Sequence, residues 1–412
     1  MELLCPYRFD LIAKYLYIKY KEKNIEFYKK VYYEHIQTFN NCWEYPGTKK
    51  GIVDFHNSFD NLINNMKHNG YNSEHPILID ENGVLVNGSH RLMSCFYFNI
   101  TPMFKTVEEK GNIDYNYNFF LNRQEHPLNR FYADFMALEY AKINSNVRSM
   151  VIYPTGNKYI DFDEIRKITN KYGYIYYTKN VELNKNGINN LIKEIYRGEE
   201  WIGGTFPNGW SPGGKAERCY LENNHTTIIL IVMQDLSKMV ELKEECRNLC
   251  DLGKHSLHIS DEPRDTIRIG GALLNDNSVK FLNNGTNDIS SKTKMLLKQY
   301  FEKSDKENYC LTSSLILEMY GLRNARDVDY ININNVDLNI ENVELHNNKW
   351  LSYYHTNVNN LIFDPNNYFY FNGYKFLDID VISKMKFKRK ETKDMKDIEL
   401  INLKTNMYQQ IG

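Results

Sequence analysis

Three short stretches of this 412-residue chain combine side chains that are able to carry phosphate chemistry. Residues 258–261 read His-Ile-Ser-Asp, residues 87–91 read Asn-Gly-Ser-His-Arg, and residues 327–329 read Asp-Val-Asp. A neutral imidazole can accept a phosphoryl group, a glycine turn with basic side chains can bind a phosphate, and paired carboxylates can bind Mg²⁺. The elements that flank each stretch decide whether its side chains are positioned for that chemistry.

His258 is expected just ahead of a helix, because the residues that follow carry apolar side chains at helical spacing. Ser260 or Asp261 is the expected N-cap of that helix, since either side chain can accept a hydrogen bond from the first turn. Arg247 and Lys254 can offset the charge of a phosphate on the imidazole. His258 is therefore a candidate for phosphoryl or proton transfer, with an ordinary surface or capping histidine as the alternative.

Residues 87–91 are expected to lead from a strand into a helix that starts near Leu92. The strand is the second half of a predicted hairpin, in which residues 77–80 pair with residues 84–86 across an Asn-Gly turn. Gly88 allows the backbone to approach a ligand closely. The donors that this turn offers to a phosphate are Asn87, Ser89, His90 and Arg91.

This hairpin and turn resemble the ParB/sulfiredoxin superfamily over about residues 34–107. The resemblance implies nucleotide or phosphate binding at the turn, with Glu34 as the base that an upstream glutamate provides in the small-molecule kinases of this superfamily. Ser89 stands where a sulfiredoxin has its cysteine, and no helix-turn-helix of a partition protein follows. The alternative is that Arg91 only pairs with a carboxylate.

The middle of the chain alternates between strand and helix patterns before it reaches residues 258–261. Strands are expected at 147–153, 174–181 and 225–233, and helices at 161–172, 188–196 and 238–251. This order resembles the nucleoside diphosphate kinase fold, a ferredoxin-like sheet, and residues 258–261 match its His-x-Ser-Asp. The resemblance implies that His258 is phosphorylated and that Arg247 is a phosphate arginine, although the family's lysine after the first strand is missing.

The loop 201–215 is rich in glycine and proline and is expected to be a lid or binding loop. Its glycines allow backbone N–H groups to approach phosphates, and Lys215 adds a positive charge. An ordinary flexible loop is the alternative.

In the last third, a strand at 309–312, a helix at 314–320 capped by Gly321, and a strand at 327–331 are expected. Asp327 and Asp329 alternate onto one face of their strand, where paired carboxylates suit a Mg²⁺–nucleotide site. Ser313 and Ser314, at the turn from strand to helix, are expected to face this pair of carboxylates.

This arrangement resembles the polymerase-β-type nucleotidyltransferase superfamily over about residues 308–331, with closer likeness to its AbiEii-like and LicD-like branches. The resemblance implies that Asp327 and Asp329 bind metal and that Arg323 belongs to the same site, and Asp378 is a candidate third carboxylate. The charged segment after residue 383 is expected to be one helix with a solvated face, or a contact for polyphosphate.

The overall composition limits the partners. The formal net charge of −1 provides no basic field that would attract nucleic acid or an acidic membrane. No apolar run reaches the roughly 18 residues that a membrane span needs, and the N-terminus lacks a signal-peptide core, so a cytoplasmic protein is expected. The seven cysteines form no CxxC pair, which favours reduced thiols over a zinc site or disulfides.

The patterns together predict a multidomain protein of the α+β or α/β class. Its expected parts are a ParB/sulfiredoxin-like domain (1–110), a helical connector (111–146), a nucleoside-diphosphate-kinase-like domain (147–285) and a nucleotidyltransferase-like domain (286–412). The favoured function is a cytoplasmic phosphotransferase that uses Mg²⁺ and a nucleoside triphosphate, ATP or CTP, to modify a small metabolite or a sugar of a surface glycan. The alternatives are a nucleotidyltransferase with Asp327 and Asp329 as its active centre, and a degenerate nucleotide-binding or scaffold protein.

Overall fold

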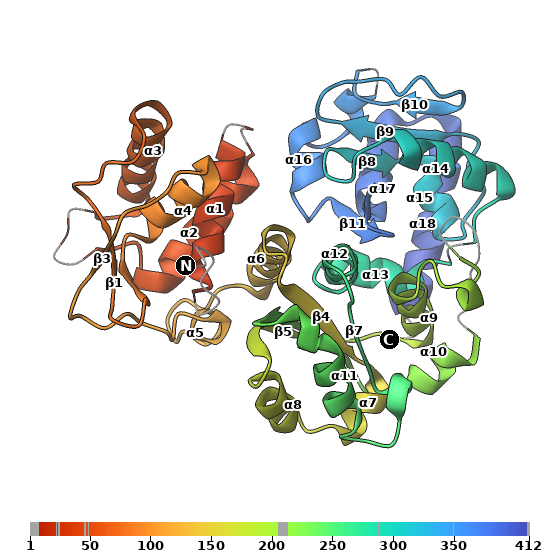
Figure 1. Cartoon of the computed structure of the whole chain (residues 1–412). Helices are drawn as coiled ribbons and strands as arrows, with labels where there is room; N and C mark the ends of the chain where they lie inside the picture. Colours follow the sequence, from red (N-terminus) through yellow and green to blue (C-terminus); the bar gives the residue numbers. More distant parts are fainter. Residues whose placement is uncertain are drawn as a thin grey trace. The chain divides into compact units, whose positions relative to one another are not determined.

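The computed structural model is a mixed α/β protein with several small sheets and many helices (Figure 1). It describes residues 8–21, 23, 25–44, 47, 49–204, 213–286, 288–348 and 350–409, with side chains up to residue 404. The chain forms two compact units. Unit 1 comprises the chain up to Asn146 together with Tyr174–Tyr177 and Leu230–Gln234, and unit 2 comprises the remainder. The predicted mixed α/β multidomain class is confirmed, while the expected boundary between residues 285 and 286 lies within unit 2.

Unit 1 combines helices with a three-stranded sheet of order β2-β1-β3. Its helices are α1 (Asp10–Lys21), α2 (Glu26–Asn40), α3 (Ile52–Asn69), α4 (Ser89–Phe98), α5 (Tyr117–Leu121) and α6 (Arg130–Ile143). Its strands are β1 (Ile77–Ile79), β2 (Leu85–Asn87) and β3 (Phe104–Thr106). Helix α3 is amphipathic: Phe55, Phe59, Ile63 and Met66 recur at helical spacing and are buried.

The predicted hairpin in unit 1 is confirmed. Strands β1 and β2 pair antiparallel, with Ile79 opposite Leu85. Gly83 in the connecting turn has a φ of 77°, which the Asn-Gly turn requires. Helix α4 begins at Ser89 rather than near Leu92, because Gly88, with a φ of 102°, turns the chain directly from strand into helix.

The middle of the chain contributes a four-stranded sheet of order β5-β6-β4-β7. Its strands are β4 (Val147–Ile152), β5 (Gly173–Val181), β6 (Thr226–Met233) and β7 (Leu257–Ile259). The helices here are α7 (Pro154–Tyr159), α8 (Phe162–Thr169), α9 (Lys185–Ile195), α10 (Gly213–Cys219), α11 (Met239–Arg247), α12 (Pro263–Leu273) and α13 (Asp276–Asn284). Every residue of β4 and β6 is buried, as expected for strands covered on both faces. The predicted alternation of strands and helices is confirmed.

The last part of unit 2 contains a five-stranded sheet of order β10-β9-β8-β12-β11. Its strands are β8 (Tyr309–Thr312), β9 (Val328–Asn332), β10 (Val343–Leu345), β11 (Tyr368–Phe371) and β12 (Tyr374–Leu377). Its helices are α14 (Ser291–Lys303), α15 (Ser314–Met319), α16 (Val358–Phe363), α17 (Ile379–Arg389) and α18 (Thr392–Gln409). Strand β9 runs antiparallel to β8 and parallel to β10, so the β8–α15–β9 unit predicted from the sequence is confirmed.

The charged segment after residue 383 differs from its prediction. It forms parts of two helices, α17 and α18, because Lys390 takes a left-handed conformation with a φ of 58°. Lys386, Asp394 and Asp397 are buried and form ion pairs, so the face is not purely solvated. Among the described residues, no helix is long and apolar enough to cross a membrane.

Candidate functional site

The turn between β8 and α15 has an unusual backbone. Ser313 has φ 61° and ψ −132°, a conformation that favours glycine and is strained for other residues. Serine thus stands at a position where the geometry suits the Gly-Ser turn of the nucleotidyltransferase pattern. The next residue, Ser314, donates a hydrogen bond from its hydroxyl to Oδ1 of Asp327 at 3.3 Å.

Asp329 lies in β9 and Asp327 directly precedes that strand, and both line a cavity of about 750 Å³, as their alternation predicted. Ser313, Ser314 and Arg323 line the same cavity, so the structure brings these five predicted residues together. Asp329 is only 5% exposed, which makes an uncompensated negative charge there costly.

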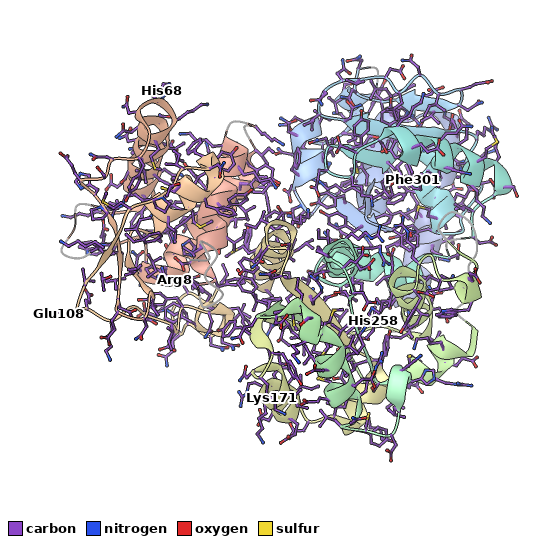
Figure 2. All side chains as sticks on the ribbon, viewed as in Figure 1. Arg8, His68, Glu108, Lys171, His258 and Phe301 are labelled. Carbon is purple, nitrogen blue, oxygen red and sulfur yellow. The ribbon has the colours of Figure 1, made fainter. Side chains whose placement is uncertain are left out.

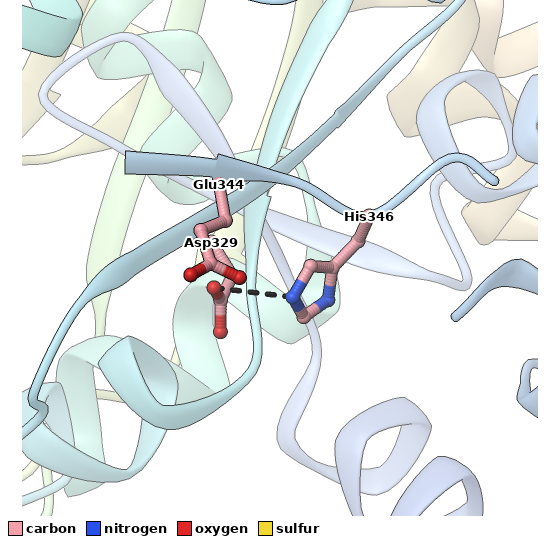
Figure 3. Close-up of side chains that lie close together, drawn as sticks. All are labelled: Asp329, Glu344 and His346. Carbon is pink, nitrogen blue, oxygen red and sulfur yellow. Dashed lines mark ion pairs between the residues drawn. The ribbon is translucent and has the colours of Figure 1, made fainter. Parts of the chain in front are cut away.

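Two further side chains approach Asp329 from β10. Glu344 is the register partner of Asp329 across the parallel pair, and His346 follows directly after the strand. The His346 Nε2 atom lies 3.1 Å from Oδ1 of Asp329 (Figure 3). One donor atom from each of these three side chains lies within 4.8 Å of the other two, which is the arrangement of a metal-binding site.

The sequence analysis missed Glu344 and His346. Strand β10 has only three residues and is surrounded by asparagine-rich loops, so its pairing with β9 left no local signal. The Glu-x-His spacing was the one available hint, because residues two apart on a strand share a face.

Asp378, the predicted third carboxylate, does not line this cavity. It caps α17 by accepting a hydrogen bond from the backbone of Asp380 at 2.9 Å, and it pairs with Lys280 at 3.2 Å. The prediction was wrong because β12 lies on the opposite side of β8 from β9. Glu344 lines the cavity together with Asp327 and Asp329.

Basic side chains from α17, α18 and the loop before β9 line the rest of the cavity. These are Arg323, Arg326, Lys386, Arg389, Lys393 and Lys396. Arg323 forms two hydrogen bonds to Asp397, at 2.5 and 2.8 Å, and this partner raises its pKa. The cavity therefore combines an acidic side that suits cations with a basic side that suits a polyphosphate.

A second cavity, of about 370 Å³, lies in unit 1. All five residues of the predicted turn line it, namely Asn87, Gly88, Ser89, His90 and Arg91. Lys49 adds a positive charge and Glu44 a negative one. The turn enters the ten-residue helix α4 directly, which is favourable for an anion.

Arg91 is held in place by carbonyl groups rather than by a carboxylate. Its Nη1 donates to the backbone oxygens of His75 and Pro76, at 2.5 and 3.1 Å. His90 shares a hydrogen bond of 2.8 Å with the Tyr32 hydroxyl, and burial lowers the pKa of His90 well below its usual value. The His90 ring is therefore neutral at pH 7.

Glu34 does not line the unit 1 cavity, although its carboxyl was the expected base. It lies on α2, half-buried, and burial raises its pKa. Glu44 is the carboxylate that the structure brings to the turn instead.

His258 lies in β7, opposite Val151 of β4, in the interior of unit 2 (Figure 2). Burial lowers its pKa to about 3, and its ring packs edge-on against Tyr196 with centroids 5.3 Å apart. The predicted helix follows as α12 (Pro263–Leu273), but His258 lies within strand β7 and not at the start of that helix. The Ser260 hydroxyl instead accepts a hydrogen bond from the Ser149 N–H at 2.9 Å, and the Ser260 N–H donates to the Ser149 carbonyl at 2.9 Å, which continues the pairing of β7 with β4.

The predicted cap and the partners of His258 also differ. Helix α12 begins at Pro263 after Glu262, because proline suits the first helical position, so Asp261 caps nothing and pairs with Lys243 at 2.9 Å. Arg247 pairs with Glu244 at 2.9 Å. Lys215 donates to the Lys254 carbonyl at 2.7 Å and lies 4.8 Å from the Tyr196 ring centre. The rest of the predicted lid, residues 205–212, lies outside the described residues.

Two cavities therefore gather the predicted residues of the Asn87–Arg91 turn and of the β8–α15–β9 unit, whereas His258, Lys215 and Arg247 line neither. No protein-family model, curated protein or solved structure matches the chain. The geometry of the two cavities is thus the guide to function.

Proposed function

We propose that the chain is a metal-dependent nucleotidyltransferase whose reaction centre is the cavity beside β9 and β10. The observation that carries this proposal is the convergence of Asp327, Asp329 and Glu344 on one cavity, which the strained residue Ser313 also lines. Carboxylate oxygens of Asp329 and Glu344 lie within 4.8 Å of each other, and such a pair repels without a cation, so the donor set fits a divalent metal.

The basic side of the cavity supports binding of a nucleoside triphosphate. Lys396 and Arg326 are exposed side chains that can reach the phosphates, whereas Lys386 and Arg389 are engaged by Asp394. The acceptor oxygen would then attack the α-phosphorus, forming a new O–P bond. The bond from that phosphorus to the bridging oxygen would break, pyrophosphate would leave, and the acceptor proton would pass to water.

A bound divalent cation, with Mg²⁺ as the expectation from the sequence, would polarise the transferred phosphoryl group. Asp327 would be oriented for this task by Ser314, which already donates a hydrogen bond to it. Asp329 would supply a buried oxygen ligand, and its low exposure would keep competing water away.

The likeness of the β8–α15–β9 unit to the polymerase-β-type superfamily remains part of the proposal. The strand order β5-β6-β4-β7 supports the ferredoxin-like interpretation of the middle region. In this order the last strand, β7, pairs with the first strand, β4, and the second strand, β5, lies at the opposite edge. The β1–β2 hairpin followed by α4 supports the ParB/sulfiredoxin-like interpretation of unit 1.

A second candidate is the phosphotransferase favoured by the sequence, with its phosphate site in unit 1. The observation in its favour is the cavity that contains Lys49, Arg91 and the start of α4. The acceptor in either case is proposed to be a small metabolite or a sugar. A phosphohistidine route through His258 is less well supported, because that ring is buried in a strand.

Product analysis separates these candidates. The chain is incubated with ATP or CTP, a divalent cation and a panel of metabolites and sugars, and both phosphate products are followed. Pyrophosphate release supports nucleotidyl transfer, and release of nucleoside diphosphate supports the second candidate. Binding of nucleotide without either product supports a degenerate binding protein and contradicts both.

A further inference from the structure

The cavity beside β9 contains a nitrogen donor that the proposed function does not require. His346 is 4% exposed, and its backbone N–H donates to the Tyr330 carbonyl at 2.8 Å, which fixes the residue beside β9. Its ring lies against Trp350, with centroids 5.7 Å apart. The imidazole is therefore held at the carboxylates by backbone pairing and by packing.

The tautomer of this ring determines what it offers. The Nδ1 atom of His346 is buried and has no hydrogen-bond partner in the described part of the chain. The Nε2–H group can donate a hydrogen bond to Oδ1 of Asp329, which lies 3.1 Å away. A divalent cation that binds both atoms would replace the Nε2 proton, because an imidazole binds metal through a deprotonated ring nitrogen.

The spacing of the three donors suits one cation. Their atoms lie within 4.8 Å of one another, and ligands about 2.1 Å from a metal are separated by about 3 to 4 Å. Small side-chain rotations are enough to bring Asp329, Glu344 and His346 onto a common ion. Figure 3 shows the three side chains converging from the two neighbouring strands.

We propose that Asp329, Glu344 and Nε2 of His346 form a mixed oxygen–nitrogen site that selects a first-row transition dication, with Mn²⁺ preferred over Mg²⁺. Mg²⁺ favours oxygen ligands and retains its water, whereas an imidazole suits transition metals, whose affinity for mixed sites exceeds that of Mg²⁺. This inference deepens the proposed function by naming its metal, but the site is expected to fill without nucleotide. The metal test is therefore independent of turnover.

The test is a Mn²⁺ titration of the whole chain, without nucleotide, followed by electron paramagnetic resonance. We expect one bound Mn²⁺ per chain that is retained in a tenfold excess of Mg²⁺, with a nitrogen coupling in the pulsed spectrum. Displacement by an equal concentration of Mg²⁺, or a bound ion without nitrogen coupling, would overturn the inference.

Variants keep the test specific. His346→Asn should weaken Mn²⁺ binding by at least about tenfold, the scale for loss of a supporting group at a metal, and should remove the nitrogen coupling. His355→Asn is the matched control, because His355 bonds to Asn367 at 3.1 Å and does not line the cavity. This variant should change neither the affinity for Mn²⁺ nor the nitrogen coupling. Glu344→Gln should weaken binding but keep the coupling. If His346→Asn does not fold, the nitrogen coupling in Glu344→Gln and in the unaltered chain still shows whether a nitrogen ligand binds the Mn²⁺.

The two proposals fail separately. Mn²⁺ bound with nitrogen coupling but no pyrophosphate in any assay would keep the metal site and reject nucleotidyl transfer. Pyrophosphate release by the unaltered chain, with a bound Mn²⁺ that shows no nitrogen coupling, would keep nucleotidyl transfer and reject the proposed function of His346.

Discussion

The two cavities differ in how they hold charge. In unit 1, Lys49 pairs with Glu44 at 3.0 Å, whereas Arg91 bonds to two backbone carbonyls and so brings its positive charge to the cavity without a carboxylate. In unit 2, carboxylates from two strands converge, and Lys386 and Arg389 are bound by buried aspartates. The first arrangement suits an anion alone, and the second suits a cation together with an anion. The predictions below test that difference.

The largest effect is expected from the carboxylate that β9 contributes to unit 2. Asp329→Asn should lower nucleotidyl transfer by about a hundredfold to a thousandfold, the scale for loss of a main electrostatic group in a reaction centre. The measurement is pyrophosphate release together with a thermal unfolding curve that shows the variant is folded. Asp337→Asn is the matched control, since Asp337 is exposed and does not line the cavity. Equal turnover of a folded Asp329→Asn and this control would contradict the account.

The next effect concerns the aspartate that holds the basic side of the same cavity. Asp394 is fully buried and accepts hydrogen bonds from Arg389 at 2.6 and 2.8 Å and from Lys386 at 3.3 Å. Asp394→Asn should therefore lower the free energy of unfolding by about 3 kcal/mol, because buried charges lose their partner. Glu399→Gln on the exposed face of α18 is the control and should change the free energy of unfolding little. Urea unfolding measures this free energy for both variants.

The same aspartate predicts a pH dependence. Burial alone would raise the pKa of Asp394, but Arg389 and Lys386 hold that pKa below its usual value. A carboxyl with a lowered folded pKa stabilises the fold above its unfolded pKa of about 4, and this contribution disappears as the pH falls through the folded pKa. Stability of the unaltered chain should therefore drop below about pH 4 more steeply than that of Asp394→Asn. Parallel curves would contradict this assignment.

The anion site of unit 1 should give a smaller effect. Arg91→Ala should weaken binding of inorganic phosphate or ADP by more than about 1.5 kcal/mol, the scale of a charge-assisted hydrogen bond. Calorimetry measures the change, and Lys105→Ala is the control, because this exposed lysine on β3 does not line the cavity. Equal affinities in a folded Arg91→Ala and in the control would remove the anion site from unit 1.

The smallest effect is expected at His258. Because its pKa is about 3 and its ring is buried, it stays neutral from pH 5 to 8 and is poorly accessible to a donor. His258→Asn should therefore leave labelling by γ-labelled ATP unchanged, as should His255→Asn. Acid-labile label that disappears only in His258→Asn would restore the phosphohistidine route and add a third centre to the comparison.

Local patterns in the sequence were enough to predict the β1–β2 hairpin, the Asn87–Arg91 turn and the β8–α15–β9 unit. Each depends on residues within about two dozen positions of one another, where spacing and turn chemistry act directly. Glu344 and His346 were missed because they reach Asp329 through a three-residue strand whose pairing is set by tertiary structure. His258 was misplaced for a related reason, since β7 pairs with the distant strand β4.

The central claim is that nucleotide binds for reaction in the cavity beside β9, and photolabelling tests it most directly. The whole chain is irradiated with an azido-substituted ATP in the presence of Mn²⁺, digested, and mapped by mass spectrometry. The account predicts label on the lining residues of that cavity, at Trp350 or on α17 and α18, and its loss in Asp329→Asn. Label confined to the unit 1 cavity, between Glu44 and Arg91, and unchanged in Asp329→Asn would contradict the account.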